Sequence, residues 1–412
     1  MALVVQIVNI IFLAACSYLL VRKSVGFKFL TIGGLALKII SGILLGWLYM
    51  YYYGYGDTLT YFKEAAQLAD LALTSPTNYL NFLNTSSEQV YKSQFVYEPR
   101  ALFFTKITSV FCLVSANNYW IVASYFSLLS FYGAWVFARL LIKHYPAQKL
   151  AILLSLFFIP SVVFWSSGII KESMSFFLIC VLSTYVVSWV VDKKYRITDV
   201  LAFAFFFFLL WKLKYYYAGV FISVALTLLF ATYLSDFKEK LSKSKVTLAG
   251  IYIVFLVVIV MIVTLFHPNL GLSEIHGVIV RNYQAYAAQS SPGNYIVFDQ
   301  LNDVSGFILS VPKALISGLY RPFIWEAQSS LMFFQGIECL ILFLLTISRL
   351  IYFPKQLSNT EFLMVVSCLM FIIITVTFLA FSAPNYGTLS RYKSALLPFL
   401  GFILLFNHPI LN

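Results

Sequence analysis

The feature that most constrains this sequence is a series of apolar runs about as long as an α-helix needs to cross a lipid bilayer, roughly 20 residues. The runs at 3–21 and 246–266 contain no charged residue. Of the 412 residues, 61% are hydrophobic and only 11% are charged, which excludes a soluble globular domain. We therefore predict an all-α, polytopic integral membrane protein that forms a single transmembrane domain over residues 1–412.

Further apolar runs bring the predicted number of transmembrane helices to about eleven. Residues 101–114 are interrupted by Lys106, and we expect them to form an interfacial or re-entrant helix. The two long polar regions, 54–118 and 267–328, are predicted to be extracytoplasmic loops carrying short interfacial helices. The predicted spans are 3–21, 30–52, 119–141, 150–165, 173–191, 200–211, 218–234, 246–266, 329–350, 362–381 and 395–406.

Basic residues are distributed unevenly between alternate short loops, and cytoplasmic loops are the ones that collect Lys and Arg. The outer short loops hold five, namely Lys171, Lys212, Lys214, Arg391 and Lys393. This asymmetry predicts an outer N-terminus and a cytoplasmic C-terminus in the inner membrane of the cell. The other side holds fifteen: Arg22, Lys23, Lys28, Arg139, Lys143, Lys149, Lys193, Lys194, Arg196, Lys238, Lys240, Lys243, Lys245, Arg349 and Lys355.

The same rule accounts for the net charge of +12, so no nucleic-acid partner is predicted. The first apolar run has no basic residue before Arg22, and we expect it to remain as a span rather than be cleaved as a signal peptide. The five cysteines show no CxxC spacing, and the four histidines are scattered. No metal cluster is therefore predicted.

The stretch from Gly54 to Glu64 ends a long apolar run and begins a polar loop. Two glycines let the backbone turn there, which holds the carboxylate of Asp57 near the membrane surface. An acid in that place can deprotonate a hydroxyl group. The alternative interpretation is that Asp57 caps a helix that starts at Thr58.

A second unusual stretch is the turn that runs from Pro160 to Ser173. Pro160 is expected to kink the preceding span, and Ser166 or Ser167 with Gly168 to form a tight reversal. Lys171 and Glu172 then begin the next span, where backbone N–H groups and Lys171 form an anion site. The alternative is that Lys171 only extends to the membrane interface.

Two later stretches also place cations before a span. One contains Arg321, Trp325 and Glu326, and the other contains Asn385, Arg391 and Lys393. Arginine suits a diphosphate because its planar fork donates two parallel hydrogen bonds. The alternative is an interfacial belt of aromatic and basic anchors.

Together these stretches resemble membrane glycosyltransferases of the GT-C type and bacterial polysaccharide polymerase-like membrane proteins. The resemblance rests on the loop acid Asp57 after an early span and on the short strings at 164–172, 321–326 and 387–393. It departs from the GT-C pattern because the acid follows the second span and lacks an adjacent second acid. No large soluble domain follows the last span either.

The resemblance implies transfer of a sugar from a polyprenyl phosphate or diphosphate to an acceptor hydroxyl on the outer face. The partners would be membrane lipid, the lipid-linked sugar donor and a glycan acceptor. No cofactor is identified, and a divalent metal ion at Asp57 stays an alternative. The predicted catalytic residues are Asp57, Lys171 and Glu172. The predicted substrate-binding residues are Tyr61, Glu98, Arg100, Trp165, Ser166, Ser167, Lys212, Lys214, Arg321, Trp325, Glu326, Asn385, Arg391 and Lys393.

Two other classes remain open, a transporter or flippase for a lipid-linked saccharide and a non-catalytic membrane assembly subunit. A transporter would use charged residues inside the bundle, for which Lys38 and Glu338 are candidates. A structural ion pair between those two residues is an equally good interpretation. An enzyme would instead concentrate its polar residues in one pocket at the outer interface.

Overall fold

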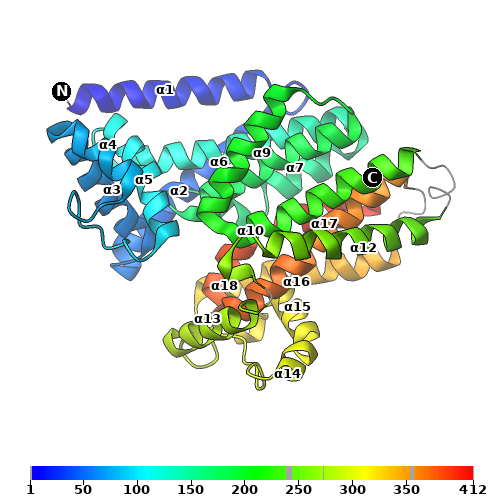
Figure 1. Cartoon of the computed structure of the whole chain (residues 1–412). Helices are drawn as coiled ribbons and strands as arrows, with labels where there is room; N and C mark the ends of the chain where they lie inside the picture. The colour runs from blue at the N-terminus through cyan, green and yellow to red at the C-terminus, as the bar shows by residue number, and fades with distance from the viewer. Residues whose placement is uncertain (1, 238–243, 272, 353–356, 412) are drawn as a thin grey trace. The chain divides into compact units, whose positions relative to one another are not determined.

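A computed structural model describes residues 2–237, 244–271, 273–352 and 357–411 (Figure 1). Helices are the main regular structure of these residues, which contain no strand but one isolated antiparallel bridge between Tyr295 and Asn385. The predicted all-α class is therefore confirmed for the described part of the chain. Lys238, Lys240, Lys243 and Lys355, which contributed to the charge count, lie outside it.

Eight helices in the described residues are long and apolar enough to cross a membrane. Seven of the predicted spans correspond closely to single helices. The eight are Ala2–Arg22, Lys28–Tyr53, Tyr119–His144, Lys171–Val191, Ile197–Phe237, Lys245–Thr264, Ser330–Ile351 and Asn359–Ser382. The chain is thus a multi-pass membrane protein by helix length and composition.

Four predicted spans differ in detail from the structure. The run at 150–165 is divided before Pro160 into α7 (Lys149–Phe157) and α8 (Pro160–Trp165), because proline cannot continue a helix. The runs at 200–211 and 218–234 lie on either side of a kink in α10 (Ile197–Phe237), where the expected turn is confined to the non-helical Lys214 (φ −148°, ψ 77°). The run at 395–406 is only the nine-residue helix α19 (Leu397–Leu405).

The chain divides into two compact units, and the expectation of one transmembrane domain stays a prediction. The first unit comprises Met1–Leu140, Leu156–Leu182 and Phe205–Lys214. The second comprises Leu141–Ser155, Ser183–Ala204 and Tyr215–Asn412.

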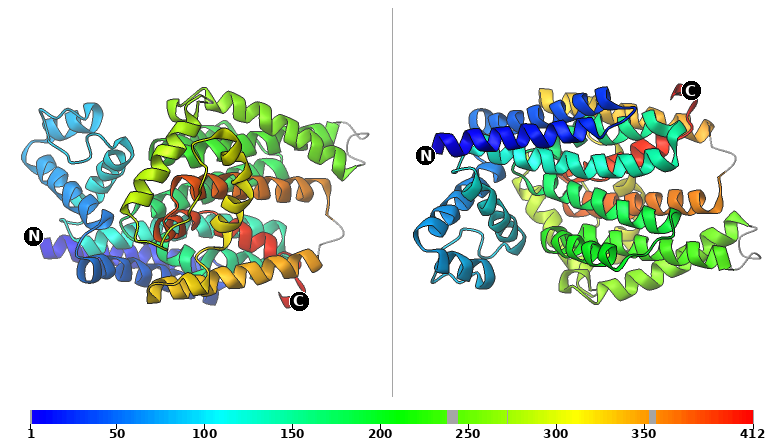
Figure 2. Two further views of the ribbon diagram at one scale, coloured as in Figure 1. Left: turned by 90° about the horizontal axis from the view of Figure 1, so that it is seen from below. Right: turned by 90° about the horizontal axis from the view of Figure 1, so that it is seen from above.

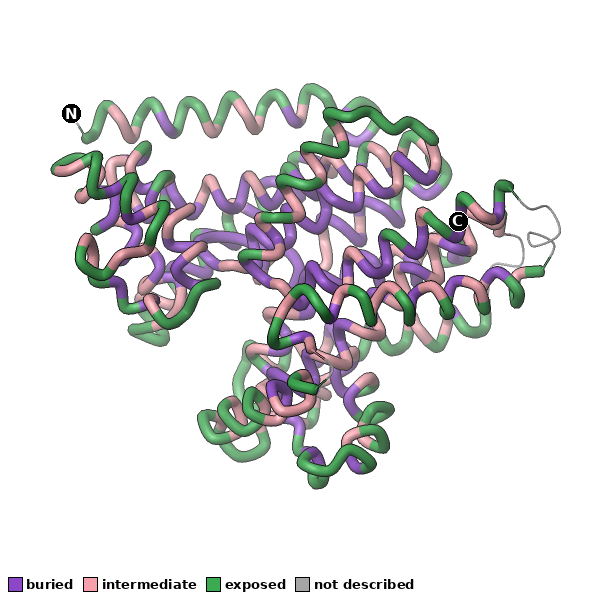
Figure 3. The backbone as a smooth tube through the Cα atoms, viewed as in Figure 1, coloured by how far each residue is buried: buried purple, intermediate pink, exposed green. Residues whose placement is uncertain are grey.

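The first unit begins with α1 (Ala2–Arg22), whose side chains are mostly exposed along its length (Figure 3). An apolar helix with an exposed surface is what a lipid-facing span requires. The other elements of this unit are α2 (Lys28–Trp47), a π-helix (Leu48–Tyr53), α3 (Asp57–Thr74), α4 (Pro76–Thr85), α5 (Pro99–Val114), α6 (Tyr119–His144), α8, α9 (Lys171–Val191) and residues 205–214 of α10. Helices α6 and α9 continue into the second unit.

The polar region at 54–118 folds as a compact group in which α3 packs along both α4 and α5 (Figure 1). Lys106, which interrupts the apolar run of α5, donates to the Leu83 carbonyl (2.8 Å) and the Ser86 hydroxyl (2.7 Å) at the end of α4. It therefore satisfies orphan acceptors at a helix C-terminus. At 16 residues, α5 is not among the candidate spans, so its interfacial placement stays a prediction.

In the second unit α17 packs against α12, α13, α15 and α19. Figure 2 shows α12, α16 and α17 as long helices, with the shorter α13–α15 at one end of them. The loop at 267–328 therefore carries short helices, as predicted. The helices from α12 onward are α12 (Lys245–Thr264), α13 (Ile275–Gln289), α14 (Val304–Leu309), α15 (Val311–Tyr320), α16 (Ser330–Ile351), α17 (Asn359–Ser382) and α18 (Tyr386–Lys393). Short 3-10 turns lie at Pro146–Gln148, Pro268–Leu270, Ile324–Glu326 and Pro409–Leu411.

Candidate functional site

The candidate site in the first unit starts where α2 gives way to α3. Gly54 (φ 72°) and Gly56 (φ 138°) both adopt the left-handed region that favours glycine. Helix α3 begins at Asp57 itself with Gly56 as its N-cap, so the alternative in which Asp57 caps a helix from Thr58 is wrong. Asp57 lies in the first turn, where the helix dipole stabilises a negative charge.

Tyr61 lies one turn after Asp57 on the same face of α3, because residues four apart in a helix lie above one another. It is only 3% exposed and packs against Phe95 (5.2 Å between ring centroids) and Phe104 (5.1 Å). The amino group of Lys171, at the start of α9, lies 5.3 Å from the centre of the Tyr61 ring. The predicted cation therefore lies over a ring on the face of α3 that also carries the predicted base. Because the ring is buried, we assign it to supporting Lys171 rather than to stacking on a sugar.

The turn before Lys171 is folded as its sequence predicts. Gly168 has a left-handed backbone (φ 71°), and its N–H donates to the hydroxyl of Ser127 on α6 (3.0 Å). Ser166 and Ser167 are fully buried and donate to the carbonyls of Val162 (2.5 Å) and Val163 (2.6 Å). Their hydroxyl groups therefore stabilise the end of α8.

Lys38 on α2 supports the same turn, although the sequence analysis placed it outside the site. It is 1% exposed, and its amino group donates to the carbonyls of Val162 (3.3 Å) and Ser166 (3.0 Å) and to the Ser166 hydroxyl. An ammonium group has three protons to donate, and these acceptors match that number. The Lys38 charge is therefore solvated by the C-terminal end of α8.

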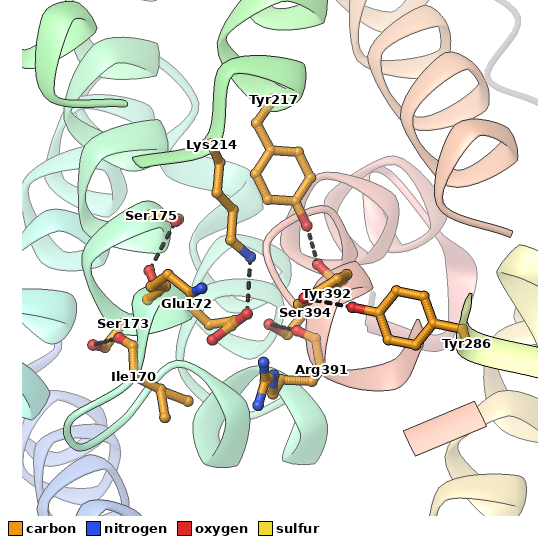
Figure 4. A network of polar contacts seen from close by, with 11 residues as sticks. Ile170, Glu172, Ser173, Ser175, Lys214, Tyr217, Tyr286, Arg391, Tyr392 and Ser394 are labelled. Carbon is orange, nitrogen blue, oxygen red and sulfur yellow. Dashed lines mark hydrogen bonds and ion pairs between the residues drawn. The ribbon is translucent and has the colours of Figure 1, made fainter. Parts of the chain in front are cut away.

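Glu172 follows Lys171 and pairs with Lys214, whose amino group lies 2.9 Å from its Oε1 atom (Figure 4). The two side chains are only 2% and 3% exposed. The sequence predicted both residues for the site without predicting that they pair. A buried carboxylate and a buried ammonium compensate each other's lost hydration.

Four other predicted residues of this unit lie nearer the surface. Glu98 and Arg100 are exposed at the start of α5, and Glu98 makes no side-chain cap to that helix. Lys212 is exposed and precedes the break in α10 at Lys214 by two residues. Its amino group lies 5.8 Å from the centre of the Phe208 ring. Trp165 is half-buried at the end of α8 and packs edge-on against Phe164.

In the second unit the structure brings together Arg321, Glu326 and Tyr386. Arg321 forms a 3.0 Å ion pair with Glu326, and the Tyr386 hydroxyl donates to the same carboxylate oxygen at 3.1 Å. Burial raises the pKa of Tyr386 against the opposing effect of the Arg321 charge, so the hydroxyl stays protonated and donates. Nearby, Trp325 is exposed and stacks on Phe323 with 4.9 Å between ring centroids.

The residues at the start and end of α18 have different surroundings. Asn385 caps the helix by accepting from Thr388 N–H (3.1 Å), and its amide donates to Ser290 (2.9 Å). Lys393 is 1% exposed and donates to the carbonyls of Arg321 (2.8 Å) and Leu319 (3.3 Å) at the end of α15. We therefore assign Lys393 to holding the backbone of Arg321. Arg391 is half-buried, and its guanidinium lies 5.4 Å from the centre of the Tyr392 ring. The backbone carbonyl of Tyr392 accepts a hydrogen bond from the Tyr217 hydroxyl (Figure 4).

One carboxylate on α3 was missed by the sequence analysis. Glu64 lies seven residues after Asp57, so it shares the face of α3 that carries Asp57 and Tyr61. It is 8% exposed and accepts a hydrogen bond from Ser93. The i, i+4, i+7 spacing of Asp57, Tyr61 and Glu64 was the signal that could have identified it.

Among the described residues, no three His, Cys, Asp or Glu side chains form a group that could hold a metal ion. No protein-family model, curated protein or solved structure matches the chain.

Proposed function

We propose that this protein is a membrane-embedded transferase that moves a sugar from a polyprenyl phosphate or diphosphate to an acceptor hydroxyl. In the proposed reaction Asp57 takes the proton of the acceptor hydroxyl as its oxygen attacks the anomeric carbon of the sugar. The bond between that carbon and the phosphate oxygen breaks, and the negative charge that develops on the phosphate is stabilised by Lys171.

The observation that carries this proposal is the position of Lys171 over the ring of Tyr61, one turn along α3 from Asp57. Lys171, at the start of α9, lies over a ring that is one turn along α3 from Asp57, although the two helices begin more than 100 residues apart in sequence. Both helix starts carry partial positive charge from unpaired N–H groups, which favours an anionic group between or beside them.

The second unit supports the proposal independently through Arg321 and Arg391. Arg321 is held at both ends, since Glu326 pairs with its guanidinium and Lys393 holds its carbonyl. A guanidinium that is fixed in this way loses little freedom when it binds a phosphate. Trp325 beside it offers an exposed aromatic face for a sugar ring.

We place this chemistry on the outer face of the inner membrane because the basic residues of the alternate loops favour an outer N-terminus. The experiment that tests the function compares lipid-linked and surface glycans in cells lacking the protein and in cells complemented with variants. Asp57→Asn and Lys171→Gln should abolish complementation, whereas Lys63→Gln, an exposed lysine on α3, should restore it fully. Normal glycans with Asp57→Asn at normal protein levels would refute the proposed role of Asp57.

The second candidate function, a flippase for a lipid-linked saccharide, is favoured by a different observation. The buried Glu172–Lys214 pair lies at a break in α10, and broken helices with internal charges are typical of transporters. The leaflet in which the lipid-linked saccharide accumulates separates the two functions. Loss of a transferase leaves it in the outer leaflet, whereas loss of a flippase leaves it in the inner one.

A further inference from the structure

A connected series of contacts runs from Glu64 to Lys171 within the first unit. The Glu64 carboxylate accepts from the Ser93 hydroxyl at 2.8 Å and from the Tyr91 hydroxyl at 3.4 Å. Tyr91 also donates to Gln67, one turn further along, at 2.7 Å. Burial and the neighbouring Glu64 charge raise the pKa of Tyr91, so its hydroxyl remains a donor.

The series continues from Ser93 to the aromatic residues below Lys171. The Phe95 N–H donates to the Ser93 hydroxyl at 3.1 Å, which fixes where the Phe95 ring lies. That ring packs on Tyr61, and Tyr61 supports the amino group of Lys171. Each step is a direct contact, and the residues come from α3, the segment before α5 and the start of α9.

Burying a carboxylate is costly unless hydrogen bonds replace its hydration. A leucine could fill the place of Glu64 on α3 without that cost, but it could not accept from Ser93 or Tyr91. The acceptor oxygens of Glu64 therefore order the segment containing Tyr91, Ser93 and Phe95. The same segment leads directly to Glu98 and Arg100.

We propose that Glu64 is a positioning residue for Lys171, acting through Ser93, Phe95 and Tyr61. It fixes the surface on which the Lys171 amino group rests without itself contacting a substrate. The significance of this position for catalysis rests on the proposed transferase function, but the positioning itself does not.

The test uses the full-length protein in nanodiscs with three variants. Glu64→Ala removes the acceptor, Glu64→Gln keeps an acceptor oxygen of the same reach, and Glu88→Ala is the control. Glu88 is an exposed carboxylate close to the same segment. Two quantities are measured: hydrogen exchange of the amides in residues 91–96, and the rate at which an amine-acylating reagent modifies Lys171, read by mass spectrometry.

We expect Glu64→Ala to speed amide exchange in this segment about tenfold or more, the scale for losing hydrogen bonds to a charged group. Acylation of Lys171 should become about threefold faster as its contact with the Tyr61 ring loosens. Glu64→Gln should restore both rates to within about twofold of the original protein, because the acceptor is retained. Glu88→Ala should change neither rate.

Faster exchange with unchanged Lys171 acylation would overturn the proposal, because Glu64 would then hold only its own segment. Failure of Glu64→Gln to rescue either rate would overturn it as well. Binding of farnesyl diphosphate is measured in parallel, as a probe of the donor site. If the original protein does not bind it, the proposed donor site fails, while exchange and acylation still decide the role of Glu64.

Discussion

The buried pair between Glu172 and Lys214 provides the sharpest prediction about stability. At 2.9 Å and an effective dielectric constant of about 20, the attraction between the two charges is about 6 kcal/mol. Removing both ions from water costs several kcal/mol each, so the net contribution of the intact pair is small. Removing one partner is different, because the other charge stays buried, and it should cost about 3–5 kcal/mol.

We therefore expect Glu172→Gln and Lys214→Met each to destabilise the protein strongly. The double variant should be less destabilised than the sum of the two single variants, because it leaves no charge behind. The matched control is the exposed pair Lys193–Asp236, whose side chains are 60% and 50% exposed. Lys193→Met should cost at most about 1 kcal/mol.

The measurement is the apparent melting temperature in detergent at one fixed heating rate, because membrane proteins commonly unfold irreversibly. With about 2–4 °C per kcal/mol for units of this size, each buried variant should melt on the order of 10 °C lower. Single variants that melt within 1 or 2 °C of the original protein, or a double variant as unstable as the sum, would refute the assignment of a buried pair.

Three further predictions follow from the structure and the sequence. Cysteines introduced at Ser86 and Ser291 should react with an impermeant thiol reagent in intact cells and one at Ser242 should not, because the asymmetry of basic residues predicts that the first two lie outside. Labelling at Ser242 alone would reverse the predicted orientation. Arg321→Lys and Arg391→Lys should weaken binding of farnesyl diphosphate by about tenfold with little change in melting temperature, because lysine lacks the planar guanidinium fork. Unchanged binding would leave both arginines as anchors at the membrane interface. The hydrogen bond from Lys143 holds the pKa of Asp192 below its usual range. This carboxylate therefore stabilises the folded protein above its unfolded pKa of about 4, and the contribution disappears as the pH falls through the folded pKa. Asp192→Asn should make the melting temperature less dependent on pH only in that acidic range, and an equal change near neutral pH would contradict this assignment.

Local backbone features were predictable because they depend on neighbouring residues alone. Pro160 ends a helix, Gly168 turns the chain and Lys171 begins the next helix, all as the sequence indicated. The partner of Glu172 was not predictable, since Lys214 is 42 residues away and pairs with it only after the chain has folded. The same is true of Lys171 over Tyr61.

The number of spans was less predictable because the apolar composition of a segment does not indicate where a helix within it ends. Residues 150–165 are apolar enough to be read as one span, although the helix ends at Phe157 and restarts at Pro160. At Lys214 the kink between the two helical segments of α10 is confined to one non-helical residue, where a turn of several residues was expected.

Three buried or half-buried lysines share a role that explains why sequence alone could not rank the cations of the site. Lys38, Lys106 and Lys393 each donate to oxygen atoms at the C-terminal end of a short helix: α8, α4 and α15 respectively. Such helix ends have unpaired carbonyls and partial negative charge, which the lysine amino groups satisfy.

A lysine in an apolar segment therefore indicates either an anionic ligand or a nearby helix end, and the sequence does not distinguish the two. Lys171 is at the start of its helix, where the backbone presents N–H groups and partial positive charge. Lys38, Lys106 and Lys393 do not begin a helix, and each contacts the C-terminal end of another one. This difference in helix polarity is the physical reason for preferring Lys171 to Lys38 or Lys393 as the cation that meets a phosphate.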